Sequence, residues 1–277
     1  MNVLVTGATG LIGRHLVEAL AQRSKVWAVS RESHAFSQGV NCVQWNFRDA
    51  VPPATMPRAV DAVFHLAQSP AYRDFPERAD DVFDVNVAST ARLLDWSRSV
   101  GVTRFVLASS GGVDGGRGFY EASKRSAELL CESYRDIFAV IVVRFFFVYG
   151  RGQRASMLIP RLVNCVRHDL PIRLDGRDGM RLNPVHVSDA VAALERTTAL
   201  SEGRTLDVTG PEVLTMREIG EMIGSLVGRR PVFVTGEAAP RDVVGDISQM
   251  SALLRAPLVP FATGIGELCD DRTDRRL

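Results

Sequence analysis

The segment VLVTGATGLIG, residues 3–13, constrains the fold of this chain more than any other stretch. Apolar, β-branched residues lead directly into three glycines at positions 7, 10 and 13, and a run typical of a helix follows. Glycines at this spacing let the backbone turn tightly between a strand and a helix. They also let it approach a pyrophosphate, whose charge the N-terminus of the helix stabilises. The segment therefore predicts a phosphate-binding turn within a strand–turn–helix unit.

Short apolar runs alternate with helical patterns over the first two-thirds of the chain. Because these runs are rich in β-branched and aromatic residues and do not alternate with polar ones, they are typical of buried strands. The predicted strands are residues 2–7, 25–30, 41–46, 62–67, 104–110 and 139–150. The predicted helices are residues 11–23, 83–100, 120–136, 157–168, 188–200 and 215–228. We therefore expect an α/β fold with a Rossmann-type, doubly wound parallel sheet.

The pattern changes after Gly150, where helices are separated by turns rich in proline and glycine. We interpret residues 1–150 as a dinucleotide-binding domain and residues 151–277 as a smaller C-terminal, substrate-binding lobe. Whether residues 183–210 return to the main sheet is left open. The last nine residues, CDDRTDRRL, are expected to fray.

Bulk properties argue against several classes of function for this 277-residue chain. Its formal net charge is only +1, so no strong field favours nucleic acid or an anionic membrane surface. The four cysteines are scattered and indicate neither a metal site nor a disulfide framework. No targeting segment and no apolar run long enough to span a membrane are visible. We expect a cytoplasmic protein with a small-molecule substrate and with neither nucleic acid, membrane nor metal as a partner.

The end of the second predicted strand bears on the choice between NAD and NADP. Sites for NAD usually carry a carboxylate there, which binds the hydroxyls of the adenosine ribose. This chain has Val29, Ser30 and Arg31 instead, and Glu32 comes one residue later than expected. Arg31 can pair with a 2′-phosphate, and Ser30 can donate a hydrogen bond to it. We therefore predict NADP as the cofactor, with NAD as the alternative.

Tyr120 and Lys124 lie four residues apart in a predicted helix, so they share one face of it. A phenol with the ordinary pKa of about 10 is a poor base at neutral pH, and a neighbouring ammonium lowers that pKa by favouring the phenolate. Ser110 ends the preceding predicted strand at the carboxyl edge of the sheet, where ligands usually bind. These residues predict a catalytic set that moves a proton to or from a substrate oxygen during hydride transfer.

Seven segments spread over most of the chain form a larger pattern: TGATGLIG, VFHLAQ, NVASTARLLD, FVLASSGGVDG, YEASK, VVRFFFVYGRGQ and RLNPVHVSDAV. In these segments the chain resembles the extended short-chain dehydrogenase/reductases, in their NAD(P)-dependent epimerase/dehydratase branch. The resemblance implies a catalytic triad of Ser110, Tyr120 and Lys124, with Lys124 also binding the nicotinamide ribose. It implies that the cofactor contacts are made in the glycine turn by Gly7, Thr9, Gly10, Leu11, Ile12 and Gly13, and elsewhere by Ser30, Arg31, Asn46, Phe47, Leu66, Ala67, Gln68, Asn86, Tyr120 and Phe145.

Departures from the family pattern narrow the predicted reaction. Dehydratases and decarboxylases of this family place an acidic residue just after the catalytic serine or threonine, whereas this chain has Gly111 and Gly112. Dehydration is therefore disfavoured, which leaves a carbonyl reductase or a 4-epimerase. Phe147 stands where sugar-nucleotide members often have an asparagine that contacts the substrate. The residues assigned to the substrate are Gly111, Gly112, Phe147, Arg181 and Arg241.

We predict an NADPH-dependent ketoreductase that acts on a nucleotide-activated keto-deoxysugar or a related carbonyl compound. An NAD-dependent nucleotide-sugar 4-epimerase is the first alternative, because an epimerase returns its hydride and typically holds NAD tightly. A non-catalytic NADP-binding sensor is the second alternative, since this fold supports both kinds of function. By resemblance, the chain forms a homodimer through the amphipathic helices predicted at residues 82–100 and 120–134.

Overall fold

The computed structural model describes residues 1–254 and 259–270 of the chain. Internal contacts divide the chain into two compact units, one formed by Met1–Arg144 with Val191–Leu206 and the other by Phe145–Ala190 with Asp207–Leu277. Most of the tail for which fraying is expected lies outside the described residues. Within the described ranges, no helix is long and apolar enough to cross a membrane.

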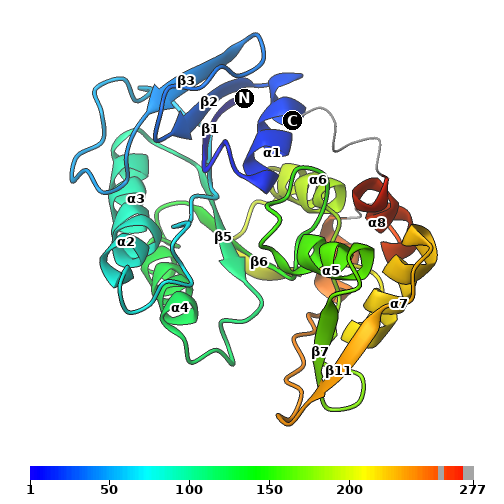
Figure 1. The fold of residues 1–277 in the computed structure, drawn as a ribbon. Coiled ribbons are helices and arrows are strands. Elements are labelled where there is room, and N and C mark those ends of the chain that lie inside the picture. The colour runs from blue at the N-terminus through cyan, green and yellow to red at the C-terminus, as the bar shows by residue number, and fades with distance from the viewer. Residues whose placement is uncertain (255–258, 271–277) are drawn as a thin grey trace. The chain divides into compact units, whose positions relative to one another are not determined.

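A seven-stranded parallel sheet runs through the first unit (Figure 1). Its strands are β1 (Asn2–Thr6), β2 (Lys25–Ser30), β3 (Val40–Gln44), β4 (Ala62–His65), β5 (Arg104–Ser110), β6 (Ala139–Phe145) and β9 (Arg204–Val208). They follow the order β3-β2-β1-β4-β5-β6-β9. In this register Val5 of β1 lies opposite both Ala28 of β2 and Phe64 of β4. Because the six predicted strands take the order typical of Rossmann-type sheets, the predicted fold class is confirmed.

Helices cover both faces of this sheet, so its central strands are buried. They are α1 (Leu11–Ala21), α2 (Ala79–Phe83), α3 (Ser89–Ser99), α4 (Phe119–Glu132) and α6 (Val187–Thr197). Figure 1 shows α2, α3 and α4 together on one side of the sheet and α1 on the other. All four residues of β4 are buried, as expected for a strand covered on both faces.

The helix predicted at residues 83–100 is interrupted near its start. Phe83 ends α2, and a π-helical turn over Asp84–Ala88 connects it to α3. Such turns widen a helix and occur frequently at functional sites. This one carries Asn86, whose side chain is buried.

The second unit contains two small sheets and three helices. Strand β7 (Pro171–Asp175) pairs in parallel with β11 (Val232–Gly236), and β8 (Arg181–Leu182) pairs antiparallel with β10 (Leu214–Thr215). The helices are α5 (Leu158–Arg167), α7 (Met216–Val227) and α8 (Phe261–Cys269), and a π-helical turn spans Met250–Leu254. Their apolar faces form a separate core that includes Ile159, Leu162, Ile219, Ile223 and Phe261. The helices predicted at residues 157–168 and 215–228 are confirmed, whereas these short strands were not predicted.

Candidate active site

The glycine turn between β1 and α1 has the geometry that its sequence predicts. Gly7 has a φ of 63°, in the left-handed region that favours glycine. A Cβ atom at Gly13 would lie only 2.1 Å from the carbonyl oxygen of Gly7, so a side chain there cannot be accommodated without a backbone shift. Gly10 N donates to Gly7 O at 2.9 Å and closes the turn. Gly7 and Gly13 are therefore required at this turn, because β1 and α1 approach each other too closely for a side chain.

The first turn of α1 fits the pyrophosphate of a dinucleotide. Gly10 is the N-cap, and no side chain in the described part of the chain caps this helix. The amide N–H groups of the first turn therefore have no intrahelical acceptor, and they carry the positive end of the helix dipole. Thr9 and Gly10 are exposed, whereas Leu11 and Ile12 are half-buried. These residues can hold an anion through backbone donors.

The residues that bear on the 2′-phosphate lie at the end of β2. Ser30 Oγ donates to the carbonyl oxygen of Glu32 at 2.6 Å, so its proton is already used in shaping the turn. Arg31 is exposed, and its carbonyl oxygen accepts from Gln44 Nε2 at 3.3 Å. Of the two predicted phosphate ligands, Ser30 therefore has its hydroxyl proton in use, whereas Arg31 is exposed.

Asn46 and Phe47 follow β3 and differ in exposure. Asn46 is exposed, and its Oδ1 accepts from Arg48 N at 3.2 Å. Phe47 is buried, with its ring centroid 4.6 Å from that of Trp45. Of these two predicted cofactor contacts, which the resemblance places beside the adenine, Asn46 is accessible to a ligand, whereas Phe47 belongs to the hydrophobic core.

The three predicted catalytic residues all belong to the first unit. Ser110 is the last residue of β5, and Tyr120 and Lys124 lie in the first two turns of α4. Tyr120 Oη donates to Gln68 Oε1 at 3.2 Å, and Ser110 also hydrogen-bonds to Tyr120. Lys124 is buried, and its Nζ donates to the carbonyl oxygen of Ala108 at 2.9 Å. The structure thus brings Ser110, Tyr120 and Gln68 together, with Lys124 beneath them on the face of α4 that meets β5.

Burial controls the ionisation of both titratable groups. It raises the pKa of Tyr120 to about 12, although the hydrogen bond with Ser110 acts in the opposite direction. Burial lowers the pKa of Lys124 to about 8, against the effect of the negative charge on Glu128. The prediction that Lys124 lowers the pKa of Tyr120 is therefore not met here, because burial dominates and Lys124 Nζ is directed to Ala108. Tyr120 is a protonated phenol at neutral pH.

The lowered pKa of Lys124 predicts a falling limb in the pH profile of any turnover that depends on the Lys124 ammonium. Above about pH 8, kcat/KM should fall about tenfold per pH unit as the ammonium loses its proton, while Tyr120 stays protonated. Lys124→Arg should move this limb to higher pH in whatever activity remains, because a guanidinium keeps its charge. A wild-type profile that stays flat to about pH 10 would contradict this assignment.

Asn86 connects the loop after β4 to α4. Its Oδ1 accepts from Ser69 N at 3.0 Å, and its Nδ2 donates to Ser123 Oγ at 2.9 Å. Ser123 Oγ donates in turn to the carbonyl oxygen of Tyr120 at 2.7 Å. One buried amide therefore supports both the loop that carries Leu66, Ala67 and Gln68 and the helix turn that carries Tyr120.

Several buried polar groups around the site were missed from the sequence. His65 lies between Thr6 Oγ1, at 2.7 Å from Nδ1, and Thr90 Oγ1, at 3.1 Å from Nε2. Burial lowers the pKa of His65 to about 3, so it is neutral and structural. Glu128 is buried against Arg144. The signal in the sequence for the ion pair of Glu128 with Arg144 was a charged residue, Glu128, placed one turn after Lys124 on the same face of the helix.

Gly111 and Gly112 follow β5 in the first unit, whereas the other residues predicted for the cofactor and substrate, from Phe145 on, belong to the second unit. Phe145 ends β6, and Phe147 follows with a φ of 46°, a conformation that costs about 1–3 kcal/mol for a residue other than glycine. Phe147 packs against the core of its unit. Arg181 Nε lies 2.8 Å from Asp242 Oδ2, so its charge already has a partner, whereas the neighbouring Arg241 is exposed.

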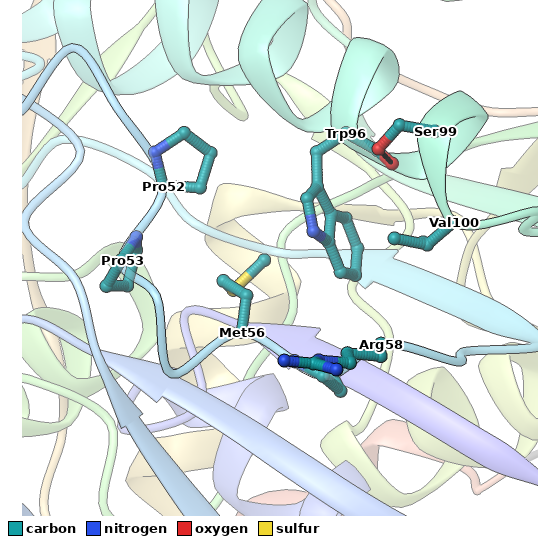
Figure 2. A pocket seen from close by; sticks show the side chains of 8 residues that line it. Pro52, Pro53, Met56, Arg58, Trp96, Ser99 and Val100 are labelled. Atoms are coloured by element: carbon teal, nitrogen blue, oxygen red, sulfur yellow. Dashed lines mark hydrogen bonds between the residues drawn. The ribbon is translucent and has the colours of Figure 1, made fainter.

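Outside the catalytic set, the described residues offer a pocket but no cluster suited to a metal ion. The pocket has a volume of about 550 Å³ and is formed by the loop at residues 52–58 and the last turn of α3, with Trp96 and Met56 on its walls (Figure 2). This loop precedes β4 and this turn precedes β5, so the pocket lies at the amino ends of these strands. Ser110 lies at the opposite, carboxyl end.

Comparisons with known proteins agree with this geometry. The chain is 26% identical over 294 aligned positions to an uncharacterized UDP-glucose epimerase of Bacillus subtilis (strain 168), and the alignment covers 92% of each. It is 26% identical to a dTDP-4-dehydro-6-deoxy-D-allose reductase of Streptomyces bikiniensis, over 96% of this chain and 94% of the relative. The solved structure of MoeE5 in complex with UDP-glucuronic acid and NAD has a TM-score of 0.80 and 27% identity, with 96% of this chain and 97% of that chain covered.

The family match covers the glycine turn, Ser110, Tyr120, Lys124 and nearly all of the central sheet. Residues 3–207 match the NAD dependent epimerase/dehydratase family, which is well over half of the chain. The strand order and the uncapped first turn of α1 are those of a dinucleotide-binding fold. This chain therefore belongs to the NAD dependent epimerase/dehydratase family.

Proposed function

We propose that this chain is an NADPH-dependent ketoreductase that acts on a nucleotide-activated keto-deoxysugar or a related carbonyl compound. The observation that carries the proposal is the protonated Tyr120 beside Ser110 at the carboxyl end of β5. Carbonyl reduction needs a proton donor at neutral pH, whereas a 4-epimerase must first remove a proton from its substrate. Gly111 and Gly112 supply no carboxylate for dehydration.

Three side chains take part in the protonation of the carbonyl oxygen: those of Ser110, Tyr120 and Lys124. Ser110 Oγ donates a hydrogen bond to the carbonyl oxygen of the substrate and polarises it. Tyr120 Oη gives its proton to the same oxygen, which takes the place of Gln68 Oε1 as the hydrogen-bond acceptor. Lys124 supplies a positive charge on the same face of α4, which favours the phenolate after the proton has left, although burial outweighs it in the protein without ligand. A bound nicotinamide supplies the hydride that adds to the carbonyl carbon.

The relatives support a nucleotide sugar as the substrate class. One is named as a reductase of a dTDP-linked keto-deoxysugar, and one solved structure holds UDP-glucuronic acid. Both arginines assigned to the substrate, Arg181 and Arg241, are exposed in the second unit. Arg181 is paired with Asp242, so Arg241 is the guanidinium better suited to phosphate oxygens. We assign Phe147, Gly111 and Gly112 to the sugar.

A turnover assay tests the proposal directly. Purified protein with NADPH and a nucleotide-linked 4-keto-6-deoxyhexose is expected to consume both in equal amounts and to yield the corresponding alcohol. UDP-glucose or UDP-glucuronic acid without added cofactor serves as the comparison substrate. Interconversion of either sugar at carbon 4, with no net oxidation of NADPH, would overturn the reductase assignment.

Arg31→Ala tests the choice of cofactor. We expect the KM for NADPH to rise about tenfold, because the exposed guanidinium loses its pairing with the 2′-phosphate. The KM for NADH should change less than about twofold, since that cofactor has no such phosphate. Arg23→Ala, which removes another exposed arginine of the same unit, is the matched control. A preference of the unmodified protein for NADH would refute the NADP assignment.

A nucleotide-sugar 4-epimerase is the second candidate function. It is favoured by the relative named as a UDP-glucose epimerase and by the NAD present in the MoeE5 structure. In this function the cofactor stays bound, and the sugar is first oxidised and then reduced at carbon 4. The same three residues, Ser110, Tyr120 and Lys124, would transfer the proton in both steps. Stoichiometric NAD released from the purified protein by denaturation would favour this function over the reductase.

We further propose a homodimer formed through the helices that carry Phe83 and Leu129. These two apolar side chains are 52% and 50% exposed, and a second copy would remove them from water. Light scattering coupled to size-exclusion chromatography measures the mass in solution. A monomeric mass at micromolar protein concentration would contradict the dimer.

A further inference from the structure

A buried carboxylate on α4 holds the end of β5 next to Ser110. Glu128 is only 1% exposed, and its Oε1 accepts from Ser109 Oγ at 2.6 Å. One turn earlier on the same helix, Lys124 Nζ donates to the carbonyl oxygen of Ala108. Two consecutive residues of β5 are therefore held by α4, and Ser110 is the next residue along the chain.

Arg144, on β6, uses all three of its guanidinium nitrogens in this network. Its Nε and Nη2 donate to Oε1 and Oε2 of Glu128 at 2.9 and 2.8 Å. Its Nη1 donates to Asp114 Oδ2 at 2.5 Å. The planar fork of arginine allows this bidentate pairing together with a third bond, which a lysine ammonium cannot reproduce. Arg144 thus joins the buried carboxylate to an exposed residue of the loop after Ser110.

The ionisation of Glu128 is consistent with this network. Burial alone would raise the pKa of its carboxyl group. Hydrogen bonds from Arg144, Ser109 and Arg125 nevertheless hold that pKa below its usual value. Glu128 is therefore a carboxylate at neutral pH, fully supplied with donors in the interior of the first unit.

The loop that Asp114 belongs to is unusually rich in glycine. Residues 111–118 include five glycines, whose backbones lose more conformational entropy on ordering than those of other residues. The loop also packs on Glu121 of α4, because a Cβ atom at Gly116 would lie 2.0 Å from Glu121 Cγ. Asp114 is the residue of this loop that forms an ion pair with the sheet.

We propose that Asp114, Arg144 and Glu128 are positioning residues that hold the glycine loop and thereby place Ser110 against Tyr120. The proposal rests on the proposed function, in which Ser110 and Tyr120 are catalytic. Asp114 ties the loop to Arg144 through an ion pair. The buried carboxylate of Glu128 fixes the position of the Arg144 guanidinium. The side chains act through Ser110 and the loop backbone, so their removal should lower kcat more than it changes the binding of NADPH.

Asp114→Asn removes the anchor charge with little risk to folding, because the Asp114 side chain is 68% exposed. The matched control is Asp169→Asn in the second unit, whose exposed carboxylate also lies 2.5 Å from an arginine, Arg229. Asp114→Glu keeps the charge and is the rescue variant. Each is compared with the unmodified protein in the presence and absence of NADPH.

Limited trypsin digestion measures how well the loop is ordered and does not require turnover, because trypsin cleaves after arginine and Arg117 is exposed in this loop. We expect cleavage after Arg117, followed by mass spectrometry, to become about five- to tenfold faster in Asp114→Asn. The control variant should leave this rate unchanged, and Asp114→Glu should restore it at least in part. An unchanged rate in Asp114→Asn would refute the anchor, whatever the catalytic activity proves to be.

Measurements of kcat and KM then distinguish a role of Asp114 in positioning Ser110 from a role in ordering the loop alone. In Asp114→Asn, kcat should fall about fivefold with the KM for NADPH within about twofold of the unmodified protein. Raising the salt concentration from about 0.1 to about 1 M should lower kcat further in the unmodified protein than in Asp114→Asn, because salt screens the exposed ion pair. Faster cleavage with unchanged kcat would refute the positioning role. Absence of turnover in the unmodified protein would count against the proposed function and leave the digestion result valid.

Discussion

Tyr120→Phe is expected to lower kcat for carbonyl reduction by about three orders of magnitude. Removing a general acid typically costs about 10²–10⁴-fold, and the Ser110 hydroxyl, which hydrogen-bonds to Tyr120, is a much weaker acid than a phenol. The ring is kept, so its packing against Tyr72, with centroids 5.0 Å apart, should persist. Steady-state turnover and equilibrium titration with NADPH measure the two quantities, and the Kd for NADPH should change less than about twofold.

Tyr134→Phe is the matched control for this variant. Tyr134 lies just beyond the same helix, and its ring stacks on Phe138 with centroids 5.6 Å apart. Loss of its hydroxyl should leave turnover unaffected. Undiminished activity in Tyr120→Phe would rule out the catalytic assignment, and NADPH binding by a protein that shows no turnover at all would favour a sensor.

Gly13→Ala is expected to destabilise the first unit by about 3 kcal/mol and to abolish cofactor binding. The added Cβ would lie 2.1 Å from Gly7 O and 2.8 Å from Gly7 C, which are backbone atoms that cannot rotate away. Overpacking of this kind typically costs about 1–3 kcal/mol, and here the strand–helix turn itself must shift. The midpoint of thermal unfolding should fall by about 10 °C.

Gly266→Ala is the corresponding control in the second unit. Apart from its chain neighbours and the backbone of its own helix, no atom of the described residues lies within 4 Å of a Cβ built at Gly266, and its φ is not in the left-handed region. Alanine in the interior of α8 should stabilise the protein by about 0.5–1 kcal/mol, because glycine loses more backbone entropy in a helix. Equal melting temperatures for both variants would show that the close contact at Gly13 is not a constraint.

The elements predicted correctly from the sequence are those with a strong local pattern. Strands β1, β4 and β5 are nearly continuous apolar runs, because helices bury both faces of the central sheet. Helix α7 was recognisable from its apolar spacing, and it begins with a capping box in which Thr215 Oγ1 accepts from Glu218 N at 3.1 Å. The glycine turn was recognisable because its backbone geometry excludes other residues.

The small sheets of the second unit were not predicted because their strands lack a continuous apolar run, and the alternation in β7 extends over only five residues. Strands β8 and β10 have two residues each, and β11 has one buried residue in five. Runs this short show no periodicity, and their hydrogen bonds come from partners tens of residues away. The π-helical turn at Asp84–Ala88 was missed for a related reason, since its widening serves contacts of Asn86 with Ser69 and Ser123.

By itself, the sequence determined the succession of strands and helices, the phosphate-binding turn and the presence of Ser110, Tyr120 and Lys124 around one short loop. Each of these depends on residues close together in the chain. Only the tertiary structure decided that burial raises the pKa of Tyr120, that Lys124 is directed to Ala108 and that Arg144 joins Glu128 to Asp114. The physical reason is that a pKa and an ion pair depend on burial and on charges supplied by distant segments. Those segments reach the site only when the sheet has formed.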